Sequence, residues 1–401
     1  MTVTLSEPGA ICASGHNCET IWQAALTGEQ AGLRASAFVT NDGTSLFAGQ
    51  VADDKLPNID SLPPAMRTRN NQLVAAALQQ IKEPLQALIN KLGSDRVGVT
   101  LGTSTSGIAS GEEALAHDET KGGLPDSFYY AMQEMLAPAE CVAELMGITG
   151  PVYSLSTACS SSARAFMSGR SLLRSGMVDA VVVGGVDSLC QLTLNGFKAL
   201  ESTSTGRCNP FSANRDGITI GEAAGLFIAT RTEDNLQPSL VTLTGACATS
   251  DAHHMSAPHP EGRGALAAMQ GALSDAELSA EQLSYINLHG TATPLNDKME
   301  AFAVNELGAS QVPASSTKAL TGHTLGAAGA IEAVFCWLAL TQQNGLPKHA
   351  WDGVKDSDIT DINLYQGDSW QTPFEHCLSN SFAFGGNNVS LVFSRGKQHG
   401  A

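Results

Sequence analysis

One cysteine, Cys159, lies where a strand-like pattern gives way to a helical pattern. The surrounding sequence is rich in small residues and reads Tyr153-Ser-Leu-Ser-Thr-Ala-Cys-Ser-Ser-Ser-Ala163. A thiol at a helix start is close to unpaired backbone N–H groups and to the positive end of the helix dipole, which favours the thiolate. The pattern predicts a nucleophilic cysteine with room for a substrate. On this window alone, a buried structural cysteine is an equal alternative.

Two downstream histidines favour the nucleophile. His289 lies in Asn287-Leu-His-Gly-Thr-Ala-Thr293, and His323 follows Lys318 by five residues in Lys318-Ala-Leu-Thr-Gly-His. Both stand beside Gly and Thr, which is unlike the apolar surroundings of an ordinary core histidine. A cysteine with histidines supplied from elsewhere in the chain is typical of covalent thiol catalysis.

These motifs, together with the C-terminal run Asn380-Ser-Phe-Ala-Phe-Gly-Gly-Asn-Asn388, resemble a known family in order and spacing. Nearly the whole chain resembles the β-ketoacyl-acyl carrier protein synthases of the decarboxylating type I/II branch, within the thiolase-like superfamily. The resemblance implies an α/β fold, a five-layer αβαβα sandwich made of two duplicated halves. It also implies decarboxylative Claisen condensation of an acyl group held on Cys159 with malonyl-acyl carrier protein, which adds two carbons to a fatty-acid, polyene or polyketide chain. No bound cofactor is expected, because the substrates are carried on the phosphopantetheine of the carrier protein.

The same resemblance implies roles for the residues around the nucleophile. His289 and His323 would donate hydrogen bonds to the thioester oxygen as carbon dioxide leaves. Lys318 would hold His323 and the local charge. Glu332, in the helix after His323, would be a buried acid; a solvated carboxylate on the helix face is the alternative.

Three further residues resemble supporting and binding positions of the family. Asp251 corresponds to another acid of the site. Thr291 and Thr293 flank His289 where the family faces the phosphopantetheine arm, and their hydroxyls could hydrogen-bond its amides. Ordinary loop-stabilising hydroxyls are the alternative.

Phe384 stands where the family has a gating phenylalanine whose backbone N–H completes the oxyanion hole. The sequence departs from the family beside it: Ala383 replaces a glycine and Asn387 replaces a threonine. A methyl group at a hinge glycine narrows the backbone angles open to the loop. We therefore expect the oxyanion role to persist and the mobility of the gate to differ.

Composition narrows the class of protein. A net charge of −17 argues against general nucleic-acid binding, which needs a basic surface. No membrane span or secretion signal is expected, and nine cysteines without C-x-x-C spacing fit neither a disulfide framework nor a metal site. A cytoplasmic location follows, with reduced cysteines. Only 15% of the residues are charged, so a partner subunit is expected to cover part of the surface.

Valine- and isoleucine-rich runs alternate with helical patterns, as in a parallel or mixed α/β sheet. A soft boundary is expected near 238–240, which divides the chain into residues 1–239 with the nucleophile and residues 240–401 with both histidines. The predicted strands are 97–101, 180–185, 225–229 and 285–288, and the predicted helices are 71–92, 262–275 and 327–341.

A different class of function is an inactive partner subunit, either like a chain-length factor or a scaffold. Such a protein would share the fold and the dimer surface, but a chain-length factor lacks the nucleophile that Cys159 supplies. A thiolase would carry a second cysteine in the loop at 382–387, where this chain has none. Initiating synthases use a Cys-His-Asn set, whereas both partner positions here are histidine.

The sequence also favours particular partners. Several segments, among them 66–71 and Ala383, are similar to the ketosynthase subunits of bacterial aryl-polyene clusters, which pair with a chain-length factor. We expect a homodimer or heterodimer formed through the strand at 151–155. Because the chain is acidic, docking of an acidic carrier protein must depend on local cations, and Arg67 and Arg69 are the predicted contacts.

Overall fold

The computed structural model describes residues 2–237, 240–367 and 373–396. Its main sheet has the strand order β12-β11-β13-β14-β10-β1-β9-β7-β5-β6, with β2 paired to β9, and β3, β4 and β8 form a small second sheet. Pro238, at the predicted boundary, lies outside the described residues. The strands are β1 Val3–Leu5, β2 Gly9–Cys12, β3 Leu33–Val39, β4 Ser45–Gly49, β5 Val97–Gly102, β6 Val152–Leu155, β7 Ala180–Asp187, β8 Ile220–Gly221, β9 Ala223–Arg231, β10 Val241–Ser250, β11 Tyr285–Asn287, β12 Ala314–Ser315, β13 His376–Ala383 and β14 Asn387–Arg395.

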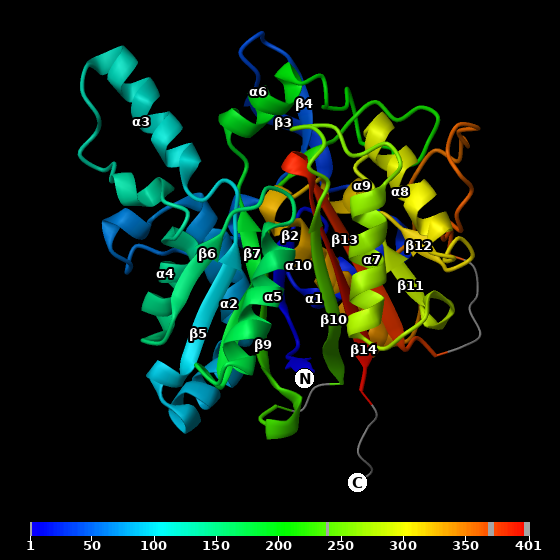
Figure 1. Ribbon diagram of the computed structural model, residues 1–401. Coiled ribbons are helices and arrows are strands. Elements are labelled where there is room, and N and C mark those ends of the chain that lie inside the picture. Colours follow the sequence, from blue (N-terminus) through cyan, green and yellow to red (C-terminus); the bar gives the residue numbers. More distant parts are fainter. Residues whose placement is uncertain (1, 238–239, 368–372, 397–401) are drawn as a thin grey trace.

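The helices and strands stack in five layers (Figure 1). Helices α2 and α4 cover the outer face of the strands of the first half, and α7 covers that of the second. Helices α5 and α10 lie between the two groups of strands, and β1 joins the groups by pairing with β9 and β10. The αβαβα sandwich expected from the sequence is confirmed. The helices are α1 Cys18–Thr27, α2 Arg69–Leu92, α3 Ile108–Lys121, α4 Ala137–Met146, α5 Ser161–Arg174, α6 Gln191–Ala199, α7 Arg263–Asp275, α8 Pro294–Glu306, α9 Lys318–Thr321 and α10 Ala328–Gln342.

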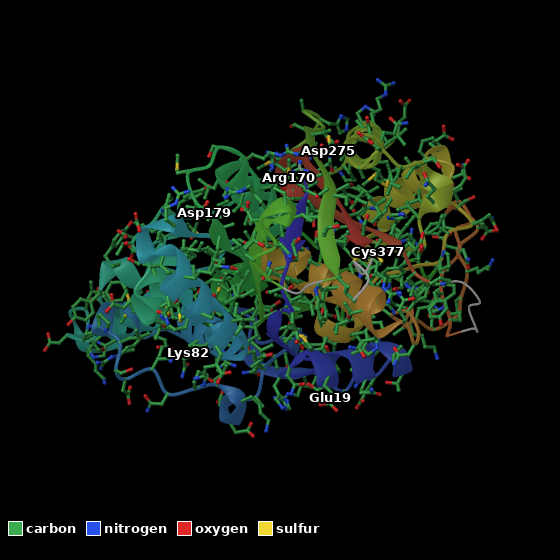
Figure 2. The ribbon with its side chains drawn as sticks, turned by 90° about the horizontal axis from the view of Figure 1, so that it is seen from below. Glu19, Lys82, Arg170, Asp179, Asp275 and Cys377 are labelled. Carbon is green, nitrogen blue, oxygen red and sulfur yellow. The ribbon has the colours of Figure 1, made fainter. Side chains whose placement is uncertain are left out.

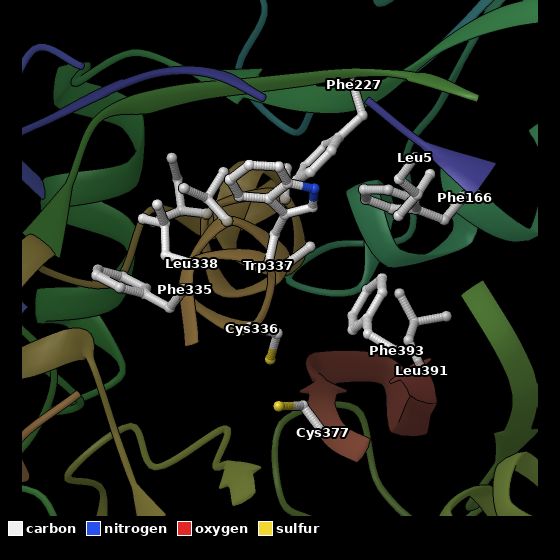
Figure 3. Close-up of a cluster of buried hydrophobic side chains, with 14 of the residues drawn as sticks. Leu5, Phe166, Phe227, Phe335, Cys336, Trp337, Leu338, Cys377, Leu391 and Phe393 are labelled. Carbon is white, nitrogen blue, oxygen red and sulfur yellow. The ribbon is translucent and has the colours of Figure 1, made fainter. Parts of the chain in front are cut away.

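The central layer is the apolar core. Phe166 of α5 packs edge-on against Phe227 and Phe393, with ring centroids 5.4 and 6.1 Å apart (Figure 3). The segment Leu325–Gln342, which contains the helix predicted at 327–341, is long and apolar enough to cross a bilayer by composition, and 89% of it is buried. An apolar surface on all sides suits a helix enclosed between two sheets.

An ion pair ties the two halves together across this core. Arg170 of α5 contacts Asp275 at the end of α7 at 2.5 Å, and both lie on the face seen from below (Figure 2). Asp275 also accepts the backbone N–H of Ala246 in β10 at 2.9 Å. The carboxylate therefore bridges a helix of the first half and a strand of the second.

The strand directions decide where chemistry can occur. Strands β5, β6 and β7 are mutually parallel, and so are β11 and β13. Loops that follow the carboxyl ends of parallel strands gather at one edge of a sheet, which is where α/β proteins place their sites. Here those loops carry Cys159 after β6, His289 after β11 and Phe384 after β13.

All nine cysteines are free thiols. Seven of them are buried, and Cys18 and Cys247 are half-buried. Cys336 of α10 and Cys377 of β13 direct their sulfur atoms toward each other at the base of the central cluster (Figure 3).

Candidate active site

A sharp turn presents the Cys159 sulfur. Ala158 has a φ of 52°, a left-handed conformation uncommon for a residue with a side chain, and Ser160 caps α5 directly after the cysteine. Helix α5 also approaches β5 closely, because a Cβ added at Gly102 would lie 2.1 Å from the backbone nitrogen of Ser162. The strand–turn–helix placement predicted for Cys159 is confirmed.

His323 contacts the sulfur of Cys159. Its Nε2 lies 3.1 Å from Cys159 Sγ, and its Nδ1 accepts the backbone N–H of Leu325 at 3.3 Å. An Nδ1 that accepts a hydrogen bond carries no proton, so the neutral ring has its proton on Nε2. Burial, followed by the charge of Lys318, holds the pKa of His323 well below its ordinary value, which keeps the ring neutral.

His289 has the same tautomer for a different reason. Lys318 Nζ lies 3.4 Å from its Nδ1, and an ammonium can only donate. Burial lowers the pKa of His289 well below its ordinary value, with smaller contributions from Lys318 and His323. The two imidazoles stand 5.4 Å apart at 85°. Each therefore presents a neutral Nε2–H group as a donor.

Lys318 and Glu332 form a buried ion pair beneath His289, with side-chain exposures of 2% and 3%. Burial raises the pKa of Glu332, and Lys318 offsets part of that rise. Glu332 is thus the buried acid expected from the sequence rather than a solvated carboxylate. The expectation that Lys318 holds His323 needs correction, since the imidazole within its hydrogen-bonding reach is that of His289.

The resting protonation state of Cys159 differs from the sequence-based expectation of a thiolate. Burial raises the pKa of its thiol to about 12, and the nearby Lys318 charge lowers the pKa only in part. The carboxylates of Asp187 and Glu332 add to the rise. Enclosure of the thiol outweighs the helix terminus because desolvation penalises the charged form.

A buried carboxylate shapes the His289 loop. Glu300 of α8 accepts the backbone N–H groups of His289 and Gly290, both at 2.7 Å. Burial raises the pKa of Glu300 to about 7, and these backbone hydrogen bonds lower it. Glu300 was not among the residues predicted from the sequence; an acid on an otherwise buried helix face is the signal that could have found it.

Cys159 and both histidines open into one cavity of about 330 Å³. Thr291 and Thr293 line it with their hydroxyl oxygens 2.9 Å apart. The cavity therefore brings the predicted nucleophile, oxyanion donors and arm-binding hydroxyls together. Predicted residues on its wall are Cys159, Asp251, His289, Thr291, Thr293, His323 and Phe384.

Phe384 borders the cavity beside Phe197 of α6, with ring centroids 5.6 Å apart. Ala383 has φ −102° and ψ 156°, an extended conformation that alanine adopts readily, whereas Gly385 and Gly386 have φ values of 80° and 75°. The alanine therefore fits this arrangement of the loop without strain, and the two glycines supply its turn.

Asp251 braces the same loop. Its carboxylate accepts the Asn388 amide at 2.7 Å and the His259 backbone N–H at 2.9 Å. Its own N–H donates to the Gly386 carbonyl at 2.8 Å. These bonds tie Asp251 to the loop that carries Phe384, on the wall of the same cavity as Cys159.

Comparison of the sequence with known families identifies two adjoining matches. Residues 9–235 match the N-terminal domain of beta-ketoacyl synthase, and residues 240–350 match its C-terminal domain. The chain belongs to the beta-ketoacyl synthase family. It is a 3-oxoacyl-[acyl-carrier-protein] synthase by activity, and its catalytic step is a condensation.

Curated relatives and solved structures agree with this family. The synthase is 30% identical over 413 residues to 3-oxoacyl-[acyl-carrier-protein] synthase 2 of Staphylococcus aureus (strain COL), with 98% of each chain covered. It is 31% identical to the Synechocystis protein of the same name, again over 98% of both chains. Among solved structures it resembles the ketosynthase ApeO in complex with its chain length factor ApeC from Xenorhabdus doucetiae, at 42% identity, a TM-score of 0.91 and 98% coverage of each chain.

Arg67 and Arg69 lie outside the catalytic cavity and line a separate groove of the synthase. Arg69 is engaged: it pairs with Glu222, whose side chain is fully buried, at 2.6 Å and with Asp53 at 2.7 Å. Arg67 is exposed and donates through Nε to the Leu62 carbonyl at 2.8 Å. Of the two predicted docking cations, the geometry leaves only Arg67 available to a partner.

Two more residues of the site escaped the sequence analysis. Phe197 pairs with the gate phenylalanine, and Asp187 ends β7 as a fully buried carboxylate. An acid at the carboxyl end of the run Val181-Val-Val-Gly-Gly-Val-Asp187 was a readable signal, because site residues collect at that edge of parallel strands. Within the described part of the chain, no group of three His, Cys, Asp or Glu side chains could hold a metal ion.

Proposed function

We propose that Cys159 carries the acyl group and that His289 and His323 stabilise the enolate formed from malonyl-acyl carrier protein. One observation carries this proposal: both imidazoles have Nδ1 occupied as an acceptor, and the Nε2 of one lies 3.1 Å from the sulfur. Two neutral donors beside an acyl-accepting sulfur suit a developing oxyanion better than they suit general-base chemistry.

The first step is thioester exchange. The sulfur of Cys159 attacks the acyl thioester, the carbon–sulfur bond to the carrier arm breaks, and the cysteine proton leaves with the arm's sulfur. Backbone N–H groups of Cys159 and Phe384 would hold the oxyanion of this step. Because the resting thiol is neutral, the proton transfer accompanies the attack rather than preceding it.

The second step consumes malonyl thioester. Its carbon–carbon bond to the carboxylate breaks, carbon dioxide leaves, and the electron pair moves onto the thioester oxygen between the two Nε2–H groups. The resulting enolate carbon attacks the acyl group on Cys159, a new carbon–carbon bond forms, and the bond between the acyl carbon and the cysteine sulfur breaks. The sulfur leaves with the electron pair and takes up one proton from solvent, which restores the thiol. A preorganised pair of donors lowers the barrier because it faces the charge only as it develops.

Substitution of the nucleophile tests these assignments. Cys159→Ala should abolish condensation and acyl-enzyme formation, and an acyl adduct detected on that variant by intact mass would refute the proposal. In a Cys159→Gln background, which imitates the acylated site, His289→Ala or His323→Ala should slow malonyl decarboxylation by roughly 10²–10³-fold. Acyl transfer to Cys159 in the single histidine variants should fall much less.

The substrates and partner of this synthase follow from the same surroundings. We propose that the phosphopantetheine arm of an acyl carrier protein enters the cavity past Thr291 and Thr293, and that no other cofactor is needed. The likeness to a ketosynthase solved with its chain length factor supports an aryl-polyene-type pathway and a heterodimeric partner. Copurification followed by identification of the partner and of the acyl group on Cys159 tests this. An inactive scaffold would resist labelling of Cys159 by a cerulenin-like epoxide.

A further inference from the structure

Asp187 is a buried carboxylate that accepts hydrogen bonds from two separate loops. Its Oδ1 accepts the Thr103 hydroxyl at 2.7 Å and the N–H groups of Ser104 and Thr105 at 2.8 Å. Its Oδ2 accepts the Ser104 hydroxyl at 2.7 Å and the N–H of Gly326 at 2.6 Å. The residues 103–105 follow β5, whereas Gly326 lies three residues beyond His323.

The Gly326 contact fixes the turn that controls His323. Leu325 has a φ of 51°, and a branched residue persists in the left-handed region only where its surroundings enforce it. This conformation directs the Leu325 N–H to His323 Nδ1 at 3.3 Å, while the next N–H along the chain, that of Gly326, is held by Asp187. Asp187 thus anchors the turn at Gly326, the residue that follows the strained Leu325.

Gly326 is tightly enclosed by the residues that it contacts. A Cβ added at Gly326 would lie 2.6 Å from Ser104 Oγ and 2.8 Å from Asp187 Oδ2. Among the described residues, no cation pairs with Asp187, so its charge is balanced by hydrogen bonds alone. A buried carboxylate is costly to desolvate unless it is hydrogen-bonded, and the donors from the two loops offset that cost.

We propose that Asp187 is a positioning residue for His323: by clamping Gly326, it holds the Leu325 N–H on Nδ1 and keeps the Nε2 proton directed at the reacting thioester. The inference rests on the proposed role of His323 in decarboxylation. Asp187 itself touches neither the substrate nor the sulfur in this scheme.

Variants on both sides of the contact test the proposal. Asp187→Asn replaces an acceptor with a donor that faces backbone N–H groups, and Gly326→Ala forces the clamp apart sterically. Thr103→Val is the matched control for the first, because both oxygens and the Gly326 contact remain. Gly206→Ala is the control for the second, because nothing lies within 4 Å of the added Cβ. Thermal unfolding identifies any variant that fails to fold.

Two measurements separate positioning from a purely structural effect. Asp187→Asn and Gly326→Ala should slow malonyl decarboxylation, measured in the Cys159→Gln background, by roughly tenfold or more. Acyl transfer to Cys159, measured with the cysteine intact, should fall by no more than about threefold; in Asp187→Asn the loss of a charge that helps to raise the thiol pKa favours the thiolate. Both reactions of the control variants should stay within about threefold of wild type. Added to His323→Ala, Asp187→Asn should cause no further loss, because the two act through one donor.

Equal losses in both half-reactions, or additive losses in the double variant, would overturn the role of Asp187. Failure of the proposed function has a different signature. If His323→Ala alone decarboxylated malonyl-acyl carrier protein at the wild-type rate, the enolate assignment would fall, whatever Asp187→Asn did.

Discussion

Lys318 reaches His289 rather than the histidine five residues after it. Its Nζ lies 3.4 Å from His289 Nδ1 and pairs with the buried Glu332. Lys318 lies in the short helix α9, and the turn at Gly322 separates it from His323, so the lysine side chain reaches the imidazole of His289 instead. Lys318 therefore sets the tautomer of His289, and the backbone N–H of Leu325 sets the tautomer of His323.

We predict that Lys318→Met impairs the synthase in two separable ways. Glu332 would be left buried without its cation, which typically costs about 3–5 kcal/mol of stability. His289 would lose the donor that fixes its tautomer, so malonyl decarboxylation should fall more than acyl transfer. Denaturant unfolding and the two half-reactions measure these effects.

The double variant Lys318→Met/Glu332→Gln separates the two effects. Removing both charges should recover much of the lost stability, because replacing a buried pair with neutral groups is often tolerated. Decarboxylation should stay low, since His289 Nδ1 still lacks its donor. Recovery of decarboxylation together with stability would show that Lys318 serves only to neutralise Glu332.

The reactivity of Cys159 should depend steeply on pH. With the thiol pKa raised to about 12, the thiolate fraction should rise about tenfold per pH unit between pH 7 and 9. Iodoacetamide labelling of the Cys159 peptide, followed by mass spectrometry, should show this slope without a plateau. Lys318→Met should label more slowly at each pH, because loss of a nearby positive charge raises the thiol pKa further. A plateau near pH 7 would indicate a resting thiolate.

The sequence was enough to predict the structural features that depend on local residue patterns and on motif spacing. The strand–helix junction at Cys159 and the valine-rich run that forms β7 both appear as expected, because buried parallel strands and helix starts have strong local signals. The duplication and the five layers came from resemblance, since a two-fold repeat of the backbone left no visible sequence periodicity. The candidate site residues were likewise predicted from motif spacing.

What the sequence could not provide was the pairing of buried polar groups. The partner of Lys318 depends on how α9 packs over α10, and the protonation of Cys159 depends on how completely the fold encloses it. The pairing of Arg69 with Glu222 joins residues 153 positions apart. These are three-dimensional contacts for which one sequence holds no local signal, so a cation predicted for docking proved to be part of the interior network.

We predict that the open edge of β6 pairs with a partner subunit. Val99 N–H bonds the Pro151 carbonyl and Thr103 N–H bonds the Leu155 carbonyl, so the backbone groups of Val152 and Ser154 face away from β5. Ser154→Pro removes one outward N–H without disturbing that ladder. Sedimentation velocity should show the dimer weakened by Ser154→Pro and retained in Ser154→Ala. A fully active wild-type monomer at micromolar concentration would contradict the prediction.

Arg67 and Arg69, both predicted from the sequence as carrier-protein contacts, should respond differently to substitution. Arg69 pairs with the buried carboxylate of Glu222, so Arg69→Met should lower the free energy of unfolding by several kcal/mol, as breaking a buried pair generally does. The Arg69→Met protein that remains folded should show little change in KM for acyl-carrier protein. Arg67→Glu should leave stability nearly unchanged, because Arg67 is exposed and, among the described residues, no carboxylate pairs with it.

If Arg67 meets the carrier protein, Arg67→Glu should raise KM for acyl-carrier protein far more than for a small acyl-thioester surrogate. Added salt should weaken wild-type binding, since attraction between an exposed cation and an acidic partner is screened. The variant should show a shallower salt dependence. Equal KM changes for the two substrates would place the docking surface elsewhere, because an acidic body with net charge −17 can attract an acidic partner only through local cations.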